Sequence, residues 1–359
     1  MWPYWFLFLV PAWLTVRRIG PASPVGGSAG RWPDWWHVMF VLLVLMVGLR
    51  HQVGGDWENY LEHVESAKYQ TLLGAVNTGD PAYSLLNWLA AKTALGIYFV
   101  NTISAAIFSW GLVVFCRAQP RPWLALVVAL PYLVTVVSMG YTRQAVAIGL
   151  AMLGLVALSE LKLLRFVLFV ALAGTFHKSA VILMPLAMLG GSRRWLWTAF
   201  WVSSASVLFY VLLLQESVDA LQSGYIDAQY QSQGAAVRVA MNALPALIFL
   251  WFRRRFMMSQ TECNFWTCMA LGALAFWGVL EWSPSSTAVD RVALYWIPLQ
   301  LFVLSRLPDV LGRREGKNAF WVGLLVTFSA AVLFVWLSFA EMAYAWLPYQ
   351  FYPWVWLWQ

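Results

Sequence analysis

Long apolar stretches constrain the fold of this chain more than any other feature of its sequence. A helix that crosses the hydrocarbon core of a bilayer needs about 20 mostly apolar residues. Of the 359 residues, 61% are hydrophobic and only 11% are charged, whereas an ordinary soluble domain carries about 25% charged residues. The predicted spans cover residues 2–16, 35–49, 97–115, 122–139, 144–160, 195–214, 239–252, 264–280, 291–305 and 319–340. The sequence therefore predicts an all-α polytopic membrane protein with about ten spanning helices, in which residues 1–359 form a single integral membrane domain.

A further apolar pair, residues 166–175 and 179–190, is too short for two comfortable crossings. Helices of ten to twelve residues reach only about 15–18 Å. We expect either a short helical hairpin that ends within the membrane or two tilted crossings. In both cases Thr175–Ser179 forms the turn.

The 23 Lys and Arg residues fall mostly in alternate connections between the predicted spans. Among these connections are Arg17 with Arg18, Arg193 with Arg194, and the run Arg253–Arg255. Because Lys and Arg favour the cytoplasmic side, this set of connections is assigned to the cytoplasm. Both termini and the turn at residues 175–179 are then predicted to lie outside.

The two larger outer loops are predicted at residues 50–96 and 215–238. Within the first, Pro81–Ala94 is expected to form an amphipathic helix at the outer face. The acidic side chains before it, Asp56, Glu58, Glu62 and Glu65, match no metal-ligand spacing and are interpreted as a solvated helical face. Tyr and Gln residues in the second loop suit sugar contact, and they are also ordinary loop composition.

Ionisable residues at membrane depth are costly and usually functional. Three arginines, Arg50, Arg143 and Arg291, stand at predicted outer helix ends, and His177 with Lys178 stands at the turn. Each arginine alone could be an anchor at the lipid surface, which is the interpretation preferred for Lys92 and Arg238. Together they suit a diphosphate, because a guanidinium binds phosphate oxygens in a bidentate way.

Five short motifs occur in order along the chain. They are Arg50-x5-Asp56-x3-Tyr60, Tyr141-Thr-Arg-Gln-Ala145, Phe176-His-Lys-Ser179, Asp290-Arg-x3-Tyr295 and Leu347-Pro-Tyr-Gln350. In order and spacing they resemble the signature of EpsG/Wzy-type polysaccharide polymerases across residues 35 to 350. The chain departs from that pattern in its richness in Trp and in the Gly-Gly that precedes Asp56.

The resemblance implies a glycosyltransferase of the C class in the bacterial cytoplasmic (inner) membrane, with its active site on the periplasmic or outer side. Such an enzyme moves a growing glycan from undecaprenyl diphosphate to a sugar hydroxyl of a new lipid-linked repeat unit. Arg143 and Arg291 are assigned to the diphosphate, with Arg50 and Lys178 in support. His177, whose pKa can lie near the working pH, is the first candidate base and Asp56 the second, while Asp290 is expected to hold Arg291. The assigned substrate-binding residues are Tyr141, Gln144, Tyr295, Tyr60 and His51.

No metal and no cofactor is expected, because a diphosphate is already a good leaving group. Expected partners are the lipid-linked oligosaccharide and membrane lipid, together with a flippase and a chain-length regulator of the same pathway. Nucleic acid is not expected. Two alternatives remain open: a flippase or transporter of the same lipid-linked sugars, and a glycan ligase that uses the same diphosphate site.

Overall fold

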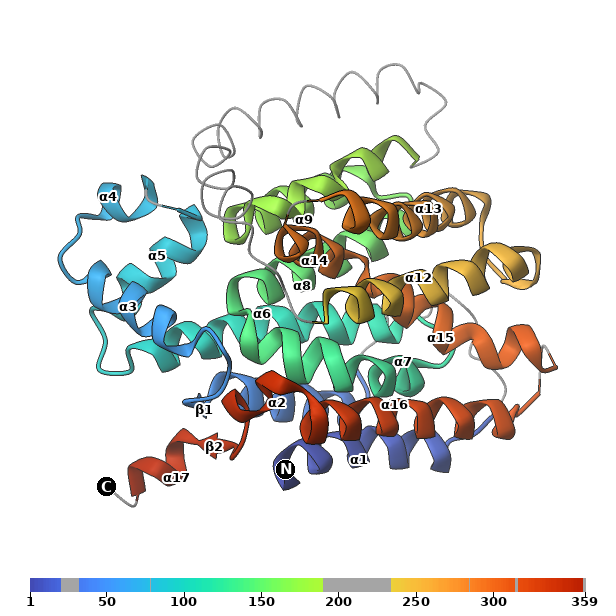
Figure 1. Ribbon diagram of the computed structural model, residues 1–359, viewed down its shortest axis with the longest axis horizontal. Helices are drawn as coiled ribbons and strands as arrows, with labels where there is room; N and C mark the ends of the chain where they lie inside the picture. The colour runs from blue at the N-terminus through green and yellow to red at the C-terminus, as the bar shows by residue number, and fades with distance from the viewer. Residues whose placement is uncertain (21–31, 78, 190–233, 284, 314–315, 358–359) are drawn as a thin grey trace.

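The apolar stretches form helices that run mostly along one direction and pack side by side (Figure 1). The computed structural model describes residues 1–20, 32–77, 79–189, 234–283, 285–313 and 316–357. The longer helices are α1 (Trp2–Arg17), α2 (Asp34–Gly48), α6 (Ile97–Arg117), α7 (Pro122–Ala129) continued by the π-helix η2 (Leu130–Ser138), α8 (Thr142–Ser159), α9 (Leu163–Phe176), the 3-10 helix η3 (Lys178–Leu189), α12 (Ala235–Phe252), α13 (Gln260–Trp282), α14 (Ser286–Ala293), α15 (Ile297–Leu311) and α16 (Ala319–Phe339).

Six helical stretches in the described part of the chain are long and apolar enough to cross a membrane. They are Ile97–Arg117, Thr142–Ser159, Ala235–Arg255, Gln260–Trp282, Ser286–Leu311 and Ala319–Phe339. The chain is thus a helical membrane protein, as predicted. Helices also occupy the other predicted spans except 195–214, which lies outside the described residues, so ten crossings stay a prediction.

The short apolar pair forms α9 and η3, which meet at His177 within the predicted turn. The short hairpin within the membrane and the two tilted crossings both stay predictions. In the first predicted outer loop the chain forms α3 (Trp57–Ala67), α4 (Leu72–Asn77) and α5 (Pro81–Ala90). Helix α5 confirms the predicted helix at Pro81, and the glutamates of α3 are exposed as expected. The second predicted loop, 215–238, lies outside the described residues up to position 233.

Helix α8 lies at the centre of the molecule, and 89% of its apolar stretch is buried inside the protein. Helices α13 and α16 are peripheral, because only 28% of the apolar stretch of each helix is buried inside the protein. Small residues let the central helices approach closely, as in other membrane proteins. A Cβ on Gly111 of α6 would lie 2.0 Å from the carbonyl oxygen of Gly149 on α8. Side chains at this crossing would therefore force the two helices apart.

The C-terminal segment returns to the end of α2. Strand β1 (Arg50–His51) pairs antiparallel with β2 (Gln350–Phe351), which places Arg50 opposite Phe351. The 3-10 helix η8 (Glu341–Ala345) precedes β2 and the short helix α17 (Tyr352–Leu357) follows it. Near β2, Tyr349 Oη donates to the carbonyl oxygen of Met46 at 2.7 Å. Two motifs at opposite ends of the sequence are thereby joined.

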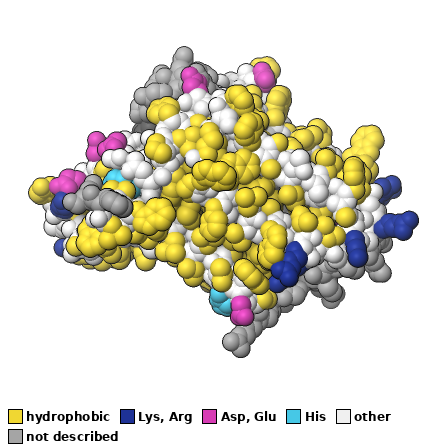
Figure 2. All heavy atoms as spheres, turned by 90° about the horizontal axis from the view of Figure 1, so that it is seen from below, with side chains coloured by type: hydrophobic (Ala, Val, Ile, Leu, Met, Phe, Trp, Pro, Cys, Tyr) yellow, Lys and Arg dark blue, Asp and Glu magenta, His cyan; other side chains and the backbone are white. Residues whose placement is uncertain are grey.

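The two ends of the helical bundle differ. The site end carries β1, α3, α5, the start of α8 and the α9–η3 turn, and both termini lie toward it (Figure 1). The basic end carries Arg17, Arg253–Arg255 (the 3-10 turn η6) and Arg313, and Figure 2 shows Lys and Arg side chains gathered beside a broad apolar surface. At the basic end Arg121 makes a two-point ion pair with Asp309, with N–O distances of 2.9 and 2.7 Å.

Candidate active site

Gly54 determines how the segment after Arg50 reaches the centre of the site end. Its φ of +109° suits glycine, and a Cβ there would lie 2.2 Å from the carbonyl oxygen of Met139. The amide of Gly54 also donates to the carbonyl oxygen of Ala345 at 2.8 Å. The chain therefore passes directly over the end of η2, and Asp56 follows as the N-cap residue immediately before α3.

Asp56 lies opposite Arg291, which comes from α14. The closest oxygen of Asp56 is 3.9 Å from Nη2 of Arg291, and both side chains are partly exposed. The guanidinium of Arg291 also stacks 3.7 Å from the centre of the Tyr141 ring, at the start of α8. This cation–π contact holds Arg291 at the junction of α3, α8 and α14. The structure therefore brings together three residues that the sequence assigned to the site.

Asp80 joins two other parts of the site. One carboxylate oxygen accepts a hydrogen bond from Arg143 at 3.2 Å, and the other accepts from the backbone amide of Lys178 at 3.2 Å. Burial raises the pKa of Asp80, while Arg143 and the Lys178 amide oppose this shift. Sequence reasoning missed Asp80. Its position directly before Pro81, where α5 begins, was the available signal.

Arg143 retains an open side. Its side chain is 38% exposed although Asp80 pairs with it, whereas that of Asp80 is 11% exposed. The guanidinium also lies 5.8 Å from the centre of the Tyr83 ring on α5. Arg143 is therefore oriented by one acid and one ring while it keeps donors for a ligand.

His177 occupies the connection between α9 and η3. Its Nδ1 atom is 2.7 Å from Oγ of Ser179, and its ring meets that of Tyr295 edge-on at 6.3 Å. Burial, together with the positive charges of Arg143 and Arg291, lowers the pKa of His177 to about 3. The pKa is thus lower than the near-neutral value expected, and the imidazole is uncharged at neutral pH. Lys178 follows it at the start of η3.

Arg50 lies beneath the site and is only 1% exposed. It donates to the carbonyl oxygens of Val47 and Val53 at 2.6 and 3.1 Å, and to side-chain oxygens of Asn101 and Thr142 at 3.3 and 2.8 Å. These bonds connect β1 and α6 to the first turn of α8. The position of Arg50 suits a residue that holds the start of α8, next to Arg143.

Three of the predicted substrate-binding residues are also buried. Tyr60 and Tyr295 are 3% and 0% exposed. Gln144, 1% exposed, donates from Nε2 to the carbonyl oxygen of Arg291 and so ties α8 to α14. His51 hydrogen-bonds Tyr98 and packs against the rings of Trp57 and Tyr352. Among the predicted substrate contacts, Tyr141 is partly exposed and lies against the guanidinium of Arg291.

Asp290 has a partner that the sequence did not suggest. Its Oδ1 accepts a hydrogen bond from Nε of Arg238 at 2.7 Å, and their side chains are 5% and 21% exposed. Arg238 is therefore a partner of Asp290 within the helical bundle, which corrects its interpretation as a surface anchor. Lys92, in contrast, is exposed and lies 4.0 Å from the centre of the Trp88 ring.

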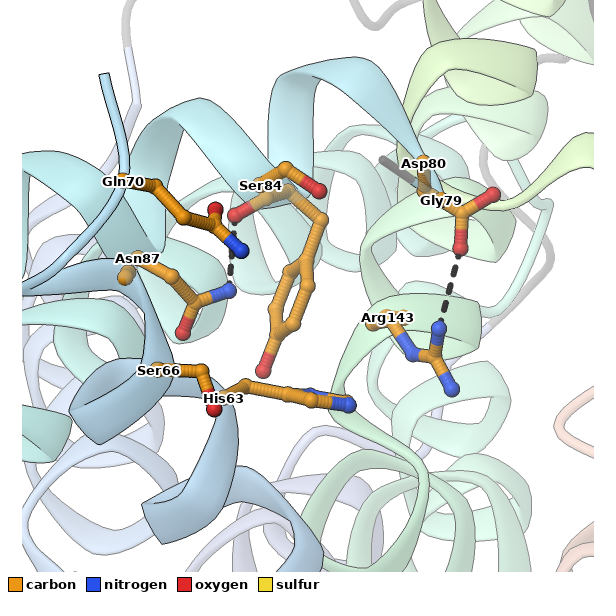
Figure 3. Close-up of a pocket in the computed structure, with 10 residues that line it drawn as sticks. His63, Ser66, Gln70, Gly79, Asp80, Ser84, Asn87 and Arg143 are labelled. Carbon is orange, nitrogen blue, oxygen red and sulfur yellow. Dashed lines mark hydrogen bonds and ion pairs between the residues drawn. The ribbon is translucent and has the colours of Figure 1, made fainter. Parts of the chain in front are cut away.

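A pocket of about 240 Å³ opens beside Arg143, between α3 and α5. Figure 3 shows Arg143 and Asp80 on one side, with His63, Ser66, Gln70 and Asn87 across from them. Arg143 thus belongs both to this pocket and to the group of residues around Asp80. The site end offers partly exposed guanidinium groups, a neutral imidazole and a polar pocket, which together suit an anionic ligand that also carries hydroxyl groups.

A family model matches residues 35–351, and it describes the EpsG family. The chain belongs to the EpsG family. All residues of the candidate site lie within the matched range, as does the pairing of β1 with β2. Comparisons with curated proteins and with solved structures gave no match. EpsG-family membership and the apolar helices point to a polysaccharide polymerase role in a membrane.

Proposed function

We propose that this EpsG-family protein joins undecaprenyl-diphosphate-linked oligosaccharide repeat units on the outer face of the cytoplasmic membrane. It transfers the growing glycan from its lipid diphosphate to a sugar hydroxyl of a new repeat unit. The observation that carries this proposal is the placement of Arg143 and Arg291. They come from different helices, both keep partly exposed guanidinium groups, and both lower the pKa of His177 between α9 and η3.

The arginines act on the leaving group. The acceptor oxygen forms a bond to the anomeric carbon while the bond from that carbon to the diphosphate oxygen breaks. The lipid diphosphate leaves with the electron pair, so negative charge develops on it. Fixed cations aimed at that charge lower the barrier. Asp80 and Tyr141 hold Arg143 and Arg291 in place before the substrate arrives, which reduces the cost of ordering them.

The acceptor hydroxyl must lose its proton during the same transfer. His177 is uncharged and can accept that proton, and Ser179 orients its ring through Nδ1. A bound diphosphate brings negative charge between the arginines, which raises the pKa of the imidazole and makes it a stronger base. Asp56 is the second candidate base, and its contact with Arg291 also fits a positioning role.

The remaining residues support this machinery. Arg50 holds the first turn of α8 through Thr142, and Gln144 fixes the backbone at Arg291. Lys178 adds positive charge beside Asp80. Tyr141 is the proposed sugar contact at the surface, while Tyr60 packs against Tyr83 and Tyr295 against His177. The reaction needs no metal, because two guanidinium groups supply the positive charge that the leaving diphosphate requires.

The test is a polymerisation assay with purified protein in nanodiscs. The substrate is the lipid-linked repeat unit that accumulates in a strain of the source organism lacking this chain. We expect a ladder of lipid-linked oligomers from the native protein, and a loss of at least a hundredfold in Arg143→Ala and in Arg291→Ala. Lys92→Ala is the control, because it removes an exposed cation that lies outside the cluster.

Each alternative gives a different outcome. Movement of the repeat unit across the bilayer of sealed proteoliposomes, with no ladder in the nanodisc assay, would support a flippase. Transfer of glycan to a different lipid acceptor would support a ligase. Normal ladders from both arginine variants would overturn the assignment of the site.

A further inference from the structure

The pocket between α3 and α5 has a buried floor and an exposed rim. Its floor includes Tyr83 on α5 and Asn87 one helical turn later, which are 2% and 3% exposed. The rim is formed by side chains of the α3 region, His63, Ser66 and Gln70 (Figure 3). A ligand would therefore enter from the α3 side and reach polar groups on α5.

Two polar atoms of this floor make no hydrogen bond of normal geometry with the described residues. They are Oη of Tyr83 and Oδ1 of Asn87. Asn87 uses its Nδ2 to donate to the carbonyl oxygen of Tyr83 at 2.8 Å, which orients the amide and makes Oδ1 its acceptor atom. Buried polar groups normally have partners, because leaving one unmatched is costly. A hydroxylated ligand matches this pair, since a hydroxyl donates to Asn87 and another oxygen accepts from Tyr83.

The charge of the pocket favours a neutral ligand group. Among the described residues that line it, Arg143 is the permanent cation and Asp80 the acid, and they pair with each other. Its volume of about 240 Å³ is below the range of about 300–1,000 Å³ that holds drug-sized ligands. It therefore suits one sugar ring better than a long oligosaccharide or a second diphosphate.

We propose that this pocket binds the sugar directly attached to the diphosphate of the lipid-linked substrate, with Tyr83 and Asn87 bonding its hydroxyl groups. Arg143 lies at the boundary, where it contacts the diphosphate and closes one side of the sugar pocket. This inference rests on the proposed function. It assigns to α5 the recognition of the first sugar, whereas α8 and α14 recognise the phosphates.

The test compares two probes by equilibrium binding in nanodiscs. One is the repeat unit isolated from the strain lacking this chain, and the other is undecaprenyl diphosphate without sugar. We expect the native protein to prefer the glycosylated lipid. The double variant Tyr83→Phe, Asn87→Leu should lose about tenfold or more in affinity for the repeat unit and bind undecaprenyl diphosphate as before. Arg143→Ala should weaken binding of both probes.

Tyr4→Phe is the matched control. It also removes a buried hydroxyl, but this hydroxyl donates to the carbonyl oxygen of Trp346 at 2.7 Å, outside the pocket. Retention of the native sugar preference by the double variant would overturn the pocket assignment and leave the polymerase proposal standing. A deletion strain that accumulates no lipid-linked glycan would overturn the proposed function, and the pocket assignment with it. Unchanged binding of undecaprenyl diphosphate shows that the double variant is folded.

Discussion

A single carboxylate, that of Asp80, connects Arg143, the proposed diphosphate ligand, with the turn that carries His177, the proposed base. Asp80→Asn removes its charge but keeps an oxygen that can accept from the Lys178 amide. We expect kcat/KM in the ladder assay to fall about ten- to a hundredfold, because a small displacement of Arg143 is costly in the transition state. Glu65→Gln is the control, since it breaks an exposed pair with Lys68 on α3. An unchanged rate in Asp80→Asn would show that Arg143 needs no partner.

The lowered pKa of His177 predicts the direction of its effect on stability. In the unfolded chain a histidine titrates near pH 6.5, whereas in the folded protein the pKa is about 3. Between these values the unfolded state binds more protons, so the stabilisation is full above pH 6.5 and declines as pH falls. The loss at its steepest is about 1.4 kcal/mol per pH unit.

Thermal unfolding in detergent between pH 7 and pH 5 measures this effect. The Tm of the native protein should fall more steeply than that of His177→Gln, which cannot take up the proton. His37→Gln, at the opposite end of the bundle, serves as the control. Parallel Tm curves for the native protein and His177→Gln would contradict a desolvated imidazole at this turn.

The same variant also tests the catalytic role of His177. The rate of polymerisation by His177→Gln should fall about a hundredfold or more, as expected for the loss of a general base.

At the scale of elements, close backbone approaches position the site. The crossing of Gly54 over Met139 places α3, and with it Asp56, above the start of α8. Gly54→Ala should destabilise the protein by several kcal/mol, since the new Cβ meets backbone and the φ is positive. We expect low yield and a lowered Tm. Gly55→Ala is the matched control, because its Cβ would lie 3.6 Å from the flexible end of Met342. Equal Tm values for the two variants would show that the chain does not cross here as described.

The elements themselves were largely predictable, because hydropathy and turn residues act locally. The predicted spans 35–49 and 97–115 correspond to α2 and α6. The turn at His177, between the end of α9 and the start of η3, lies at the centre of the predicted turn Thr175–Ser179. Pairings between distant elements were not predictable in the same way. The contact of Asp80 with Lys178 and that of Asp290 with Arg238 depend on how helices pack, and no local pattern in the sequence encodes them. The burial of Arg50 and Tyr60 was missed for the same reason. A motif shows which residues belong to a site, but it does not show which of them are buried under its surface.

At the scale of the whole molecule, the asymmetry of charge and the position of the site make one combined prediction. The residues of the candidate site lie at one end of the bundle, and the clusters Arg253–Arg255 and Arg313 lie at the other. The distribution of Lys and Arg assigns the basic end to the cytoplasm. The polymerase proposal requires the same orientation, because its lipid-linked substrate is used outside. The two arguments are independent, so one measurement of orientation tests both.

Cysteine labelling in whole cells measures that orientation. In a variant with Cys116, Cys263 and Cys268 replaced by Ala, single cysteines are introduced as Glu62→Cys on α3 and Arg254→Cys in η6. A membrane-impermeant maleimide should label Glu62→Cys in intact cells, and Arg254→Cys only after the cells are permeabilised. Both positions are exposed in the structure. A difference in labelling between them therefore reports only on which side of the membrane each one lies. The reverse pattern would place the site end, with Arg143 and Arg291, in the cytoplasm and exclude polymerisation at the outer face, whatever activity the purified protein shows.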